Sequence, residues 1–584
     1  MLFEDLCNYF ERLEETQSRN SMISILAELF QEATENNIDK ICYFIAGDIV
    51  PGYKDINLGM GEEMTKASLS MATGMKETDI EERLREGGDL GDVAAQISME
   101  KHSKYDEIFD FEELTVDTVH RGLVRIASTS GENSKEIRKK TMAALLSKAG
   151  PNSRRYLIRL ALGKMRLGVG HMTILDGLAA SFLGSKDERP PLEHAFNVSS
   201  DIGYVGKILA KSGLDGVKRI RTVINRPVRP QLAQRVDRLS QIREKIDSVK
   251  ISVEEKYDGE RIQAHKKDDG VRLFSRRLNE VTHQFPEIVE NVMKHVDAES
   301  AIIDGEAVAY NFEEGEYNPF QKIMRRRRKY DVDEYAEKIP VKYMVFDLLY
   351  LNGRSMMRMG YTDRTGKLHR IVPEEKYLAP SGRIFTEELD RIDEYFQSCI
   401  ERGLEGIICK STAEDSYYHA GAREWSWIKW KPSYASELSD TLDLVVVGAY
   451  AGKGKRGGTY GALLCASYNP DEDVYETVTT LGTGFTDEQL AELPDKLKNA
   501  LIEQKPARVK ATDNVEPDYW FNPEYVLEVR GSEITNSPVH TCNWDPEDER
   551  GLAVRFPRFE RWRPDKSAEQ ATTTEEIVQM SEEG

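Results

Sequence analysis

The sequence is poor in the residues that build disulfide or zinc frameworks. Its 584 residues include six cysteines, which lie far apart and form no C-x-x-C pair. That spacing disfavours a zinc ribbon and a disulfide framework, and it fits a reducing compartment. The 10 histidines show no metal-ligand spacing, so a histidine metal site is not expected.

Long hydrophobic runs are also missing. The longest apolar stretches, such as DLVVVGAY, are too short to span a bilayer. The N-terminus MLFEDLCNYFERLEETQSR carries acids where a signal peptide needs a basic start and an apolar run. We therefore expect a cytoplasmic protein that has no membrane partner.

An excess of positive charge is absent, because 101 acidic residues outnumber 80 lysines and arginines and give a net charge of −21. Taken alone, this disfavours a nucleic-acid binder. Basic residues nevertheless cluster in RRRRK (residues 325–329), SRR (275–277) and RPVRP (226–230). Binding to phosphates depends on such local patches rather than on the total, so net charge decides little here. We interpret RRRRK as a solvated or DNA-facing loop.

The hydrophobic pattern divides the chain into regions, and the length alone predicts two to four domains. Residues 1–225 have the three- and four-residue apolar spacing of helices. The proline-rich stretch VINRPVRPQLAQR (223–235) is expected to be a linker, and from about residue 232 to 432 the chain mixes strands and helices. About five short strands and one helix in residues 433–566 are typical of a small barrel of the OB type. Residues 567–584 form an acidic tail, for which packing as a short helix is left open.

Within the first region, residues 154–184 predict a helix, a glycine break at 168–170 and a second helix. Such a hairpin leaves backbone N–H groups free to hold an anion such as a DNA phosphate, but an ordinary helical turn explains it equally well. In the middle region a helix is expected within residues 280–296. The strands expected there are Ile251–Lys256, Arg261–Lys266, Val271–Ser275, Ala301–Ile303, Val341–Leu349 and Gly406–Lys410.

The stretch ISVEEKYDGERIQAHK places Lys256 at the end of one of these strands. Asp258, Gly259 and Arg261 follow it and complete the pattern K-x-D-G-x-R. Alone, this pattern fits a salt-bridged lysine at a strand end as well as a nucleophile. A lysine nucleophile needs cations that lower its pKa, carboxylates that hold a metal, and a pocket for a base.

Candidates for each of these groups follow in order along the chain. Arginines and lysines supply the cations, glutamates the carboxylates, and an aromatic residue the wall of a base pocket. They are Arg276 in SRR, Glu306 in DGEAV, Phe346 and Asp347 in KYMVFDLLYLNG, Glu405 and Lys410 in LEGIICK, Arg423, Lys429 and Lys431 around WIKWK, and Arg555, Arg558, Arg561 and Arg563 in RFPRFERWRPDK. Phe346 also fits a simple core position in a buried strand.

This ordered set resembles the motifs of the archaeal and eukaryal-type ATP-dependent DNA ligases, members of the covalent nucleotidyltransferase superfamily. The matching motifs are KYDGER, SRR, DGEAV, KYMVFDLLYLNG, LEGIICK, WIKWK and RFPRF, and the N-terminal region matches at RLGVGHMTILDGLA and NRPVRPQLAQR. The resemblance covers all but about the last eighteen residues. It implies an all-α DNA-binding domain (1–225), an α+β adenylation domain (226–432) and a C-terminal OB-fold (433–566).

The resemblance also implies roles for individual residues. Lys256 would take AMP from ATP as a phosphoramidate, Glu254 would contact the adenine amino group, and Phe346 and Ile408 would enclose the base. The charged residues would act on the rest of the nucleotide. In this reading Arg261 and Arg276 contact ribose, phosphates or the DNA 5′-phosphate, Glu306 and Glu405 hold Mg²⁺ or order the ribose, Arg423, Lys429 and Lys431 stabilise the phosphates, and Arg555 and Arg558 orient the pyrophosphate.

The function implied is ATP-dependent sealing of nicks in duplex DNA during replication, repair and recombination, by a monomer. The alternatives are an RNA ligase or capping-type nucleotidyltransferase, or a non-catalytic DNA-bridging protein. A sliding-clamp contact is a further hypothesis, because KYDEIFDFEELTV keeps Phe109 and Phe111 but lacks the glutamine of the usual motif. The sequence leaves open whether ADP, GTP or NAD replaces ATP.

Overall fold

A computed structural model describes the chain except for residues 55, 57, 98–113, 237, 269, 314, 319–321, 324–325, 327–337, 432–440, 453–458, 532 and 584. Phe109 and Phe111 therefore lie outside the described residues. The chain divides into two compact units. The first comprises Met1–Ile80 and Gly91–Lys431, and the second comprises Glu81–Leu90 and Pro432–Gly584.

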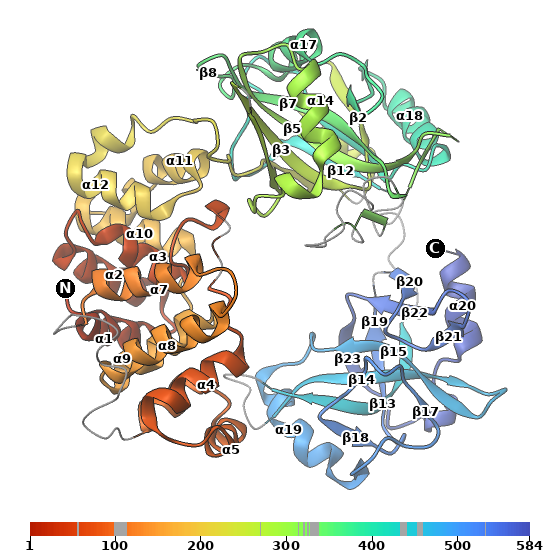
Figure 1. Ribbon diagram of the computed structural model, residues 1–584. Helices are drawn as coiled ribbons and strands as arrows, with labels where there is room; N and C mark the ends of the chain where they lie inside the picture. The colour runs from red at the N-terminus through yellow and green to blue at the C-terminus, as the bar shows by residue number, and fades with distance from the viewer. Residues whose placement is uncertain are drawn as a thin grey trace. The chain divides into compact units, whose positions relative to one another are not determined.

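The first unit begins with helices, coloured red to yellow in Figure 1. Helix α1 (Phe3–Glu14) illustrates why they form, since its apolar residues recur at helical spacing and bury one face. The prediction of a helical N-terminal region is confirmed. The other helices before residue 226, of which α5 lies mostly in the second unit, are α2 (Arg19–Glu32), α3 (Ile38–Ala46), α4 (Glu62–Thr73), α5 (Glu77–Gly87), α6 (Leu90–Gln96), α7 (Val116–Ser128), α8 (Ser134–Ser147), α9 (Pro151–Ala161), α10 (His171–Leu183), α11 (Pro190–Ser199) and α12 (Ile202–Val217).

The predicted helix–glycine–helix segment is present. Helix α9 ends at Ala161 and α10 begins at His171. Between them Gly163 and Gly168 have φ angles of 64° and 68°, in the left-handed region that glycine adopts without a Cβ penalty. These two glycines let the chain reverse between the helices.

The middle of the chain forms two sheets. One has the strand order β1-β12-β11-β2-β10 and the other the order β4-β3-β5-β7-β8, with β6 paired to β5 and β9 paired to β7. Helix α14 (Pro286–His295) buries Ile288 and Val292 in the core of the second sheet. The strands are β1 (Leu232–Arg235), β2 (Ile251–Lys256), β3 (Glu260–Lys267), β4 (Gly270–Ser275), β5 (Ser300–Asn311), β6 (Glu316–Tyr317), β7 (Val341–Leu351), β8 (Arg354–Ser355), β9 (Leu378–Pro380), β10 (Arg383–Thr386), β11 (Gly406–Ser411) and β12 (Arg423–Trp430).

The strands expected from the sequence are all present, but two expectations need correction. Strand β5 continues through Gly305 to Asn311, because Gly305 has no side chain to collide with Tyr343 of the neighbouring strand. The proline-rich linker is shorter than expected. Its last residues form β1, which pairs in parallel with β12.

The remaining linker is held against β3 by two buried side chains. The backbone N–H of Asn225 donates to Nδ1 of His265 at 3.0 Å, and that of Val228 donates to Oε1 of Gln263 at 2.8 Å. Since Nδ1 of His265 accepts, its Nε2–H donates to Gln263 Oε1 at 2.9 Å. The linker is therefore fixed only while His265 is neutral.

We expect stability to fall with acid through His265. Burial lowers the pKa of His265 from 6.5 to about 3. Between pH 6.5 and about 3, His265 is therefore protonated in the unfolded state but neutral in the folded state. The free energy of unfolding falls by up to about 1.4 kcal/mol per pH unit as the pH drops through this range. Urea unfolding between pH 7 and 4 tests this. His265→Gln should flatten the pH dependence, whereas replacing the exposed His283 with Gln should leave it unchanged.

One basic side chain of RRRRK is buried, contrary to its interpretation as a solvated or DNA-facing loop. Arg326 is only 2% exposed; its Nη2 donates to Oε2 of Glu287 at 2.9 Å, and its guanidinium lies 5.0 Å from the ring centre of Phe285. The carboxylate and the ring compensate for burial of the charge. Residues 325 and 327–329 lie outside the described part of the chain.

The second unit is rich in strands, but the expected number of about five is too small. Its described residues form β13 (Leu442–Ala451), β14 (Tyr460–Asn469), β15 (Val474–Leu481), β16 (Leu501–Ile502), β17 (Val509–Lys510), β18 (Tyr519–Phe521), β19 (Val526–Arg530), β20 (Glu533–Ser537), β21 (Cys542–Asp545), β22 (Arg550–Arg555) and β23 (Arg558–Trp562). Strands of two or three residues carry too little alternation to be seen in a sequence. The helix expected over residues 487–502 is α19 (Asp487–Leu497), which is shorter, because residues 501 and 502 form β16.

The acidic C-terminal segment packs onto this unit. Helix α20 (Thr574–Glu583) inserts Ile577 fully into the core, and Oγ1 of Thr574 donates to Oε2 of the buried Glu476 at 2.9 Å. The six cysteines are buried and free. Within the described residues, none of the helices is long and apolar enough to cross a membrane.

Candidate active site

Lys256 is the last residue of β2, on the same strand face as Ser252 and Glu254. Strand β11 runs antiparallel beside it and places Gly406 opposite Lys256. The amine contacts one carboxylate oxygen of Glu405, and the amine of Lys431 contacts the other. The sequence-predicted nucleophile therefore shares a carboxylate with a second lysine.

Glu255, which directly precedes Lys256 in the sequence, lies in a different environment from Glu254. Glu255 points to the opposite face of β2, where its carboxylate pairs with Arg402 and accepts a hydrogen bond from the Tyr257 hydroxyl. Only Glu254 shares the face of Lys256. The alternation of the strand thus separates the two adjacent glutamates.

Gly259 is required by the close packing of the turn that follows Lys256. A Cβ at this position would lie 2.4 Å from the carbonyl oxygen of Ala307 and 2.8 Å from Cγ of Glu306. Glycine lets the turn approach β5 where Glu306 lies, and β3 then pairs Arg261 opposite Glu306. The glycine of the K-x-D-G-x-R pattern is therefore needed for the turn between β2 and β3 to pack against β5.

The environment lowers the pKa of Lys256, as a nucleophilic amine requires. Burial is the main cause, the positive charge of Arg276 adds to it, and Glu306 and Asp258 oppose it. Burial also raises the pKa of Glu306 to about 7, against the effects of Lys256 and Arg261. The sequence analysis required cations to lower the pKa of Lys256, whereas burial is the larger cause.

Phe346 and Ile408, the predicted walls of a base pocket, lie close to Glu254. Phe346 and Ile408 are both partly exposed, although their strand neighbours Val345 and Ile407 are fully buried. Phe346 is therefore not a simple core residue. Its ring lies edge-on to Trp427 with centroids 6.3 Å apart. Phe346 of β7 and Trp427 of β12 both lie near the amine of Lys410 on β11.

Arg261 is anchored rather than mobile. Its Nε and Nη2 donate to the two oxygens of Asp304 at 3.1 and 2.7 Å, and its Nη1 donates to the carbonyl of Gln231 at 2.7 Å. Burial opposes its charge, but Asp304 raises the pKa of Arg261 above its usual value. Sequence reasoning missed Asp304, although it stands directly before the glycine of DGEAV.

The other cations predicted for the site differ in their exposure to solvent. Arg276 and Arg423 are exposed, and Lys429 lies opposite Ile408 on β12. Burial, followed by the charge of Lys256, lowers the pKa of Lys429. The proximity of these two amines makes the region receptive to an anion.

In the second unit, the predicted run of four arginines separates into two pairs. Arg561 forms an ion pair with Glu528, and Nη1 of Arg563 lies 2.8 Å from Oδ2 of Asp443. Arg555 and Arg558 are exposed. Arg561 is itself 67% exposed despite its ion pair, so three of the four arginines present their charge on the surface of this unit.

The carboxylates beside Lys256 fit a divalent metal that also takes oxygens from its substrate. Glu306, Glu405 and Asp258 are oxygen donors of the kind Mg²⁺ prefers, and Mg²⁺ keeps several waters and binds phosphate. Across the part of the chain that the structure describes, no three His, Cys, Asp or Glu residues form a ready-made metal cage. A metal here would complete its coordination with phosphate and water.

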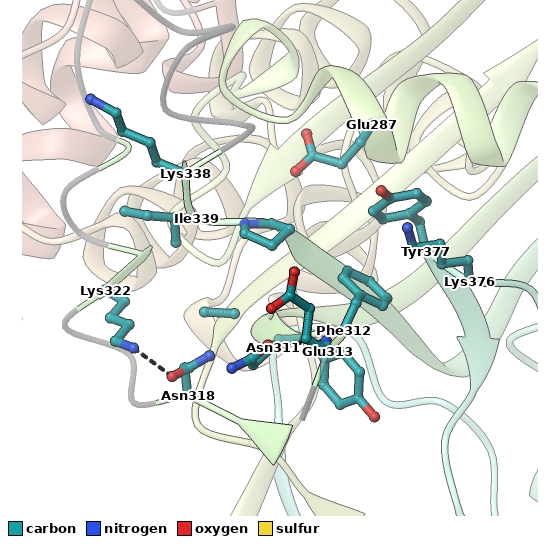
Figure 2. A pocket seen from close by; sticks show the side chains of 13 residues that line it. Glu287, Asn311, Phe312, Glu313, Asn318, Lys322, Lys338, Ile339, Lys376 and Tyr377 are labelled. Carbon is teal, nitrogen blue, oxygen red and sulfur yellow. Dashed lines mark hydrogen bonds between the residues drawn. The ribbon is translucent and has the colours of Figure 1, made fainter. Parts of the chain in front are cut away.

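A hollow of about 710 Å³ lies at the last residues of β5 and includes none of the predicted site residues (Figure 2). Phe312 and Tyr377 line it together with the carboxylates of Glu287 and Glu313. The amine of Lys322 donates to Asn318 at 2.6 Å along its edge. Its mixed charge distinguishes it from the cationic surroundings of Lys256.

Comparison with family models gives matches over most of the chain. Residues 2–179 match the DNA ligase N terminus, residues 230–431 the ATP dependent DNA ligase domain, and residues 456–566 the ATP dependent DNA ligase C terminal region. The middle match includes Lys256 and every first-unit residue predicted for the site.

Individual proteins are similar over nearly their whole lengths. A DNA ligase of Staphylothermus marinus is 41% identical over 99% of this chain and 98% of its own length. DNA ligase 2 of Thermofilum pendens is 43% identical over 98% and 96%. The solved structure Pmar-Lig_Pre. covers 96% of this chain and 99% of its own, with a TM-score of 0.55 at 18% identity, and so shares the fold.

Proposed function

This chain belongs to the ATP-dependent DNA ligase family, and from that membership we propose that Lys256 carries AMP between ATP and the nick. The enzyme seals nicks in DNA with ATP. The observation that carries the proposal is the side chain of Lys256, which is only 18% exposed and contacts Glu405. Burial lowers the pKa of its amine, against the charge of Glu306. Such an amine is available as a neutral nucleophile closer to neutral pH than an exposed lysine is.

The proposed reaction has three steps. The neutral amine of Lys256 attacks the α-phosphorus of ATP, the bond to the bridging oxygen breaks, pyrophosphate leaves, and the nitrogen loses a proton. A 5′-phosphate oxygen at the nick then attacks the same phosphorus and frees the lysine. Finally the 3′-hydroxyl attacks the 5′-phosphate, displaces AMP, and closes the strand.

The surrounding cations would offset the charge that develops on the phosphates. We assign this to Arg423, Lys429 and Lys431, while Arg276 meets the phosphates of ATP or of the DNA end. Arg261, fixed by Asp304, would orient the ribose. In the second unit Arg555 and Arg558 would orient the departing pyrophosphate.

We assign Glu306 and Glu405 to Mg²⁺, which would neutralise phosphate charge when bound. Before Mg²⁺ binds, the two glutamates differ in their surroundings. Lys256 and Lys431 satisfy both oxygens of Glu405, whereas burial raises the pKa of Glu306 to about 7. Glu306 is thus poised to lose a proton when a cation approaches.

The base would lie between Phe346 and Ile408, with Glu254 at its edge. Phe346 offers a ring face for stacking, which suits any flat base, so selectivity has to come from polar groups. Glu254 is the acid on the strand face of Lys256, and its position two residues earlier matches a nucleotide whose phosphate reaches the amine.

The domain roles follow the same proposal. Residues 1–225 would bind DNA, 226–432 perform adenylation, and 433–566 form an OB-fold that presents Arg555 and Arg558. Grip on the sugar–phosphate backbone would let the enzyme act at any nick during replication, repair and recombination. Cytoplasmic location, a monomeric state and sliding-clamp binding through Phe109 and Phe111 are predictions. Clamp affinity that is unchanged when both phenylalanines become alanine would remove the last of these.

The test is covalent labelling. Incubated with α-labelled ATP and Mg²⁺, the full chain should gain acid-labile, base-stable label on the peptide that contains Lys256, and nicked DNA should discharge it. Label from γ-labelled ATP should not be retained, because the γ-phosphate leaves with pyrophosphate. Label on a different peptide would contradict the assignment of Lys256 without affecting family membership.

A further inference from the structure

A buried group of polar side chains lies beneath the proposed base site and grips Glu254. Glu254 is 2% exposed, and its two oxygens face two different partners. Oε2 lies 2.6 Å from the amine of Lys410, and Oε1 accepts a hydrogen bond from the hydroxyl of Tyr361. Tyr361 and Lys410 are both fully buried.

The Tyr361 hydroxyl is the hub of this group. Oγ of Ser252 lies 2.9 Å from it, and Nη1 of Arg383 donates to it at 3.3 Å. Because the guanidinium can only donate, it occupies a lone pair of the hydroxyl and leaves the phenolic proton for Glu254. Burial and the charge of Glu254 raise the pKa of Tyr361 well above its usual value, so it stays a donor.

Lys410 contacts Glu254 through its charge rather than through an aligned hydrogen bond. Its amine lies among three aromatic rings, 4.1 Å from the ring centre of Trp427, 4.9 Å from that of Phe346 and 5.3 Å from that of Tyr361. Despite its proximity to Glu254, it makes no aligned hydrogen bond. The directional bond that fixes the carboxylate therefore comes from Tyr361.

A carboxylate held in this way can only accept. Each oxygen has more than one lone-pair site, so Glu254 can accept from Tyr361 and also from a ligand. Adenine presents an amino donor at position 6, whereas guanine presents a carbonyl acceptor there. With guanine in the site, the carboxylate of Glu254 would face the carbonyl oxygen of the base, and neither acceptor would have a donor. Leaving buried polar groups unpaired in this way strongly disfavours binding of the wrong base.

We propose that Tyr361 is a positioning residue for base selectivity, which holds Glu254 as an acceptor and thereby favours ATP over GTP. The inference rests on the proposed contact of Glu254 with the base. It goes further by assigning the choice of nucleotide to a hydroxyl of α17 (Tyr361–Ile371), outside the strand that carries Lys256. The backbone N–H of Tyr361 donates to Oγ of Ser416 at 3.1 Å, which fixes the start of that helix.

Tyr361→Phe tests the proposal because it removes one oxygen and keeps the ring. We expect the KM for ATP in self-adenylation to rise roughly tenfold, as for loss of a hydrogen bond to a charged group, with kcat within about twofold. The ratio of kcat/KM for ATP to that for GTP should fall by a similar factor. Both constants come from the rate of label incorporation from α-labelled ATP or GTP.

Tyr343→Phe is the matched control. Tyr343 is equally buried in the same unit, and its hydroxyl donates to the carbonyl of Ile262 at 2.8 Å, away from Glu254. It should leave the ATP-to-GTP ratio unchanged. If Tyr361→Phe does not fold, Arg383→Ala removes a donor that orients the Tyr361 hydroxyl and should lower the ratio in the same direction.

An unchanged ratio in Tyr361→Phe, or an equal fall in Tyr343→Phe, would overturn the proposal. Neither result affects the assignment of Lys256, because label on its peptide is measured separately in the wild-type protein. Absence of that label would instead overturn the proposed function itself. The two failures are therefore distinguishable in one set of assays.

Discussion

Lys256→Ala should abolish self-adenylation, with label incorporation reduced by about four orders of magnitude or more, because no other group supplies the attacking nitrogen. Lys256→Arg should be equally inactive. A guanidinium retains the positive charge but stays protonated at any accessible pH and cannot attack phosphorus. The measurement is label incorporation from α-labelled ATP, followed over hours so that a slow residual rate is visible.

The reaction sequence provides an internal control for this variant. The last step uses the 3′-hydroxyl and not the lysine, so Lys256→Ala should still seal a nick whose 5′-phosphate already carries AMP. Loss of both activities would indicate a folding defect rather than a missing nucleophile. Lys376→Ala changes a lysine beside the hollow of Figure 2 and should keep both activities. Normal labelling of Lys256→Ala would remove this residue from the mechanism.

Alternation in the sequence predicted where Lys256 lies, whereas Glu306 and Phe346 lie inside β5 and β7 rather than at the strand ends expected for them. Strand β2 has the bounds expected from alternation, and Lys256 ends it as predicted. Once β2 pairs with β11, residues far apart in the sequence meet; Glu405, 149 positions after Lys256, reaches it because Gly406 pairs with Lys256. A spaced set of motifs can be predicted when a sheet is what brings its members together.

The partners of those residues could not be predicted, because they depend on packing between elements. Tyr361 starts a helix whose sequence shows no sign that its hydroxyl reaches Glu254, 107 positions away. Arg326 stands in a run of identical residues, and nothing in that run marks it as a partner of Glu287. Side-chain pairing of this kind follows from three-dimensional neighbours and not from local periodicity.

Arg364→Leu should cost the first unit about 3–5 kcal/mol, the range for removing one partner of a buried ion pair. Nε of Arg364 lies 2.8 Å from Oδ1 of Asp347, and neither side chain is exposed to solvent. Nη1 of Arg364 also donates to the carbonyls of Met359 and Ser416, which the variant would leave unpaired. The effect can be measured by urea unfolding combined with hydrogen exchange of peptides from α17 and β7.

The matched control is the exposed pair on α18 (Leu389–Glu401). Nη1 of Arg391 lies 2.6 Å from Oε2 of Glu394, but both side chains are more than half exposed, so Arg391→Leu should change stability by less than about 1 kcal/mol. Asp347→Asn combined with Arg364→Leu should recover part of the loss, because the stranded charge is gone. Equal effects of the buried and exposed changes would contradict the reasoning.

The same pair connects stability to nucleotide binding. Asp347 follows Phe346 on β7, and Arg364 lies one helical turn after Tyr361 on α17. The ion pair thus ties the proposed stacking residue to the helix that holds Glu254 in place. Arg364→Leu should therefore weaken ATP binding even at temperatures where the chain is folded, and it should raise KM in the same direction as Tyr361→Phe. A variant that is destabilised but binds ATP normally would show that β7 and α17 position the base independently.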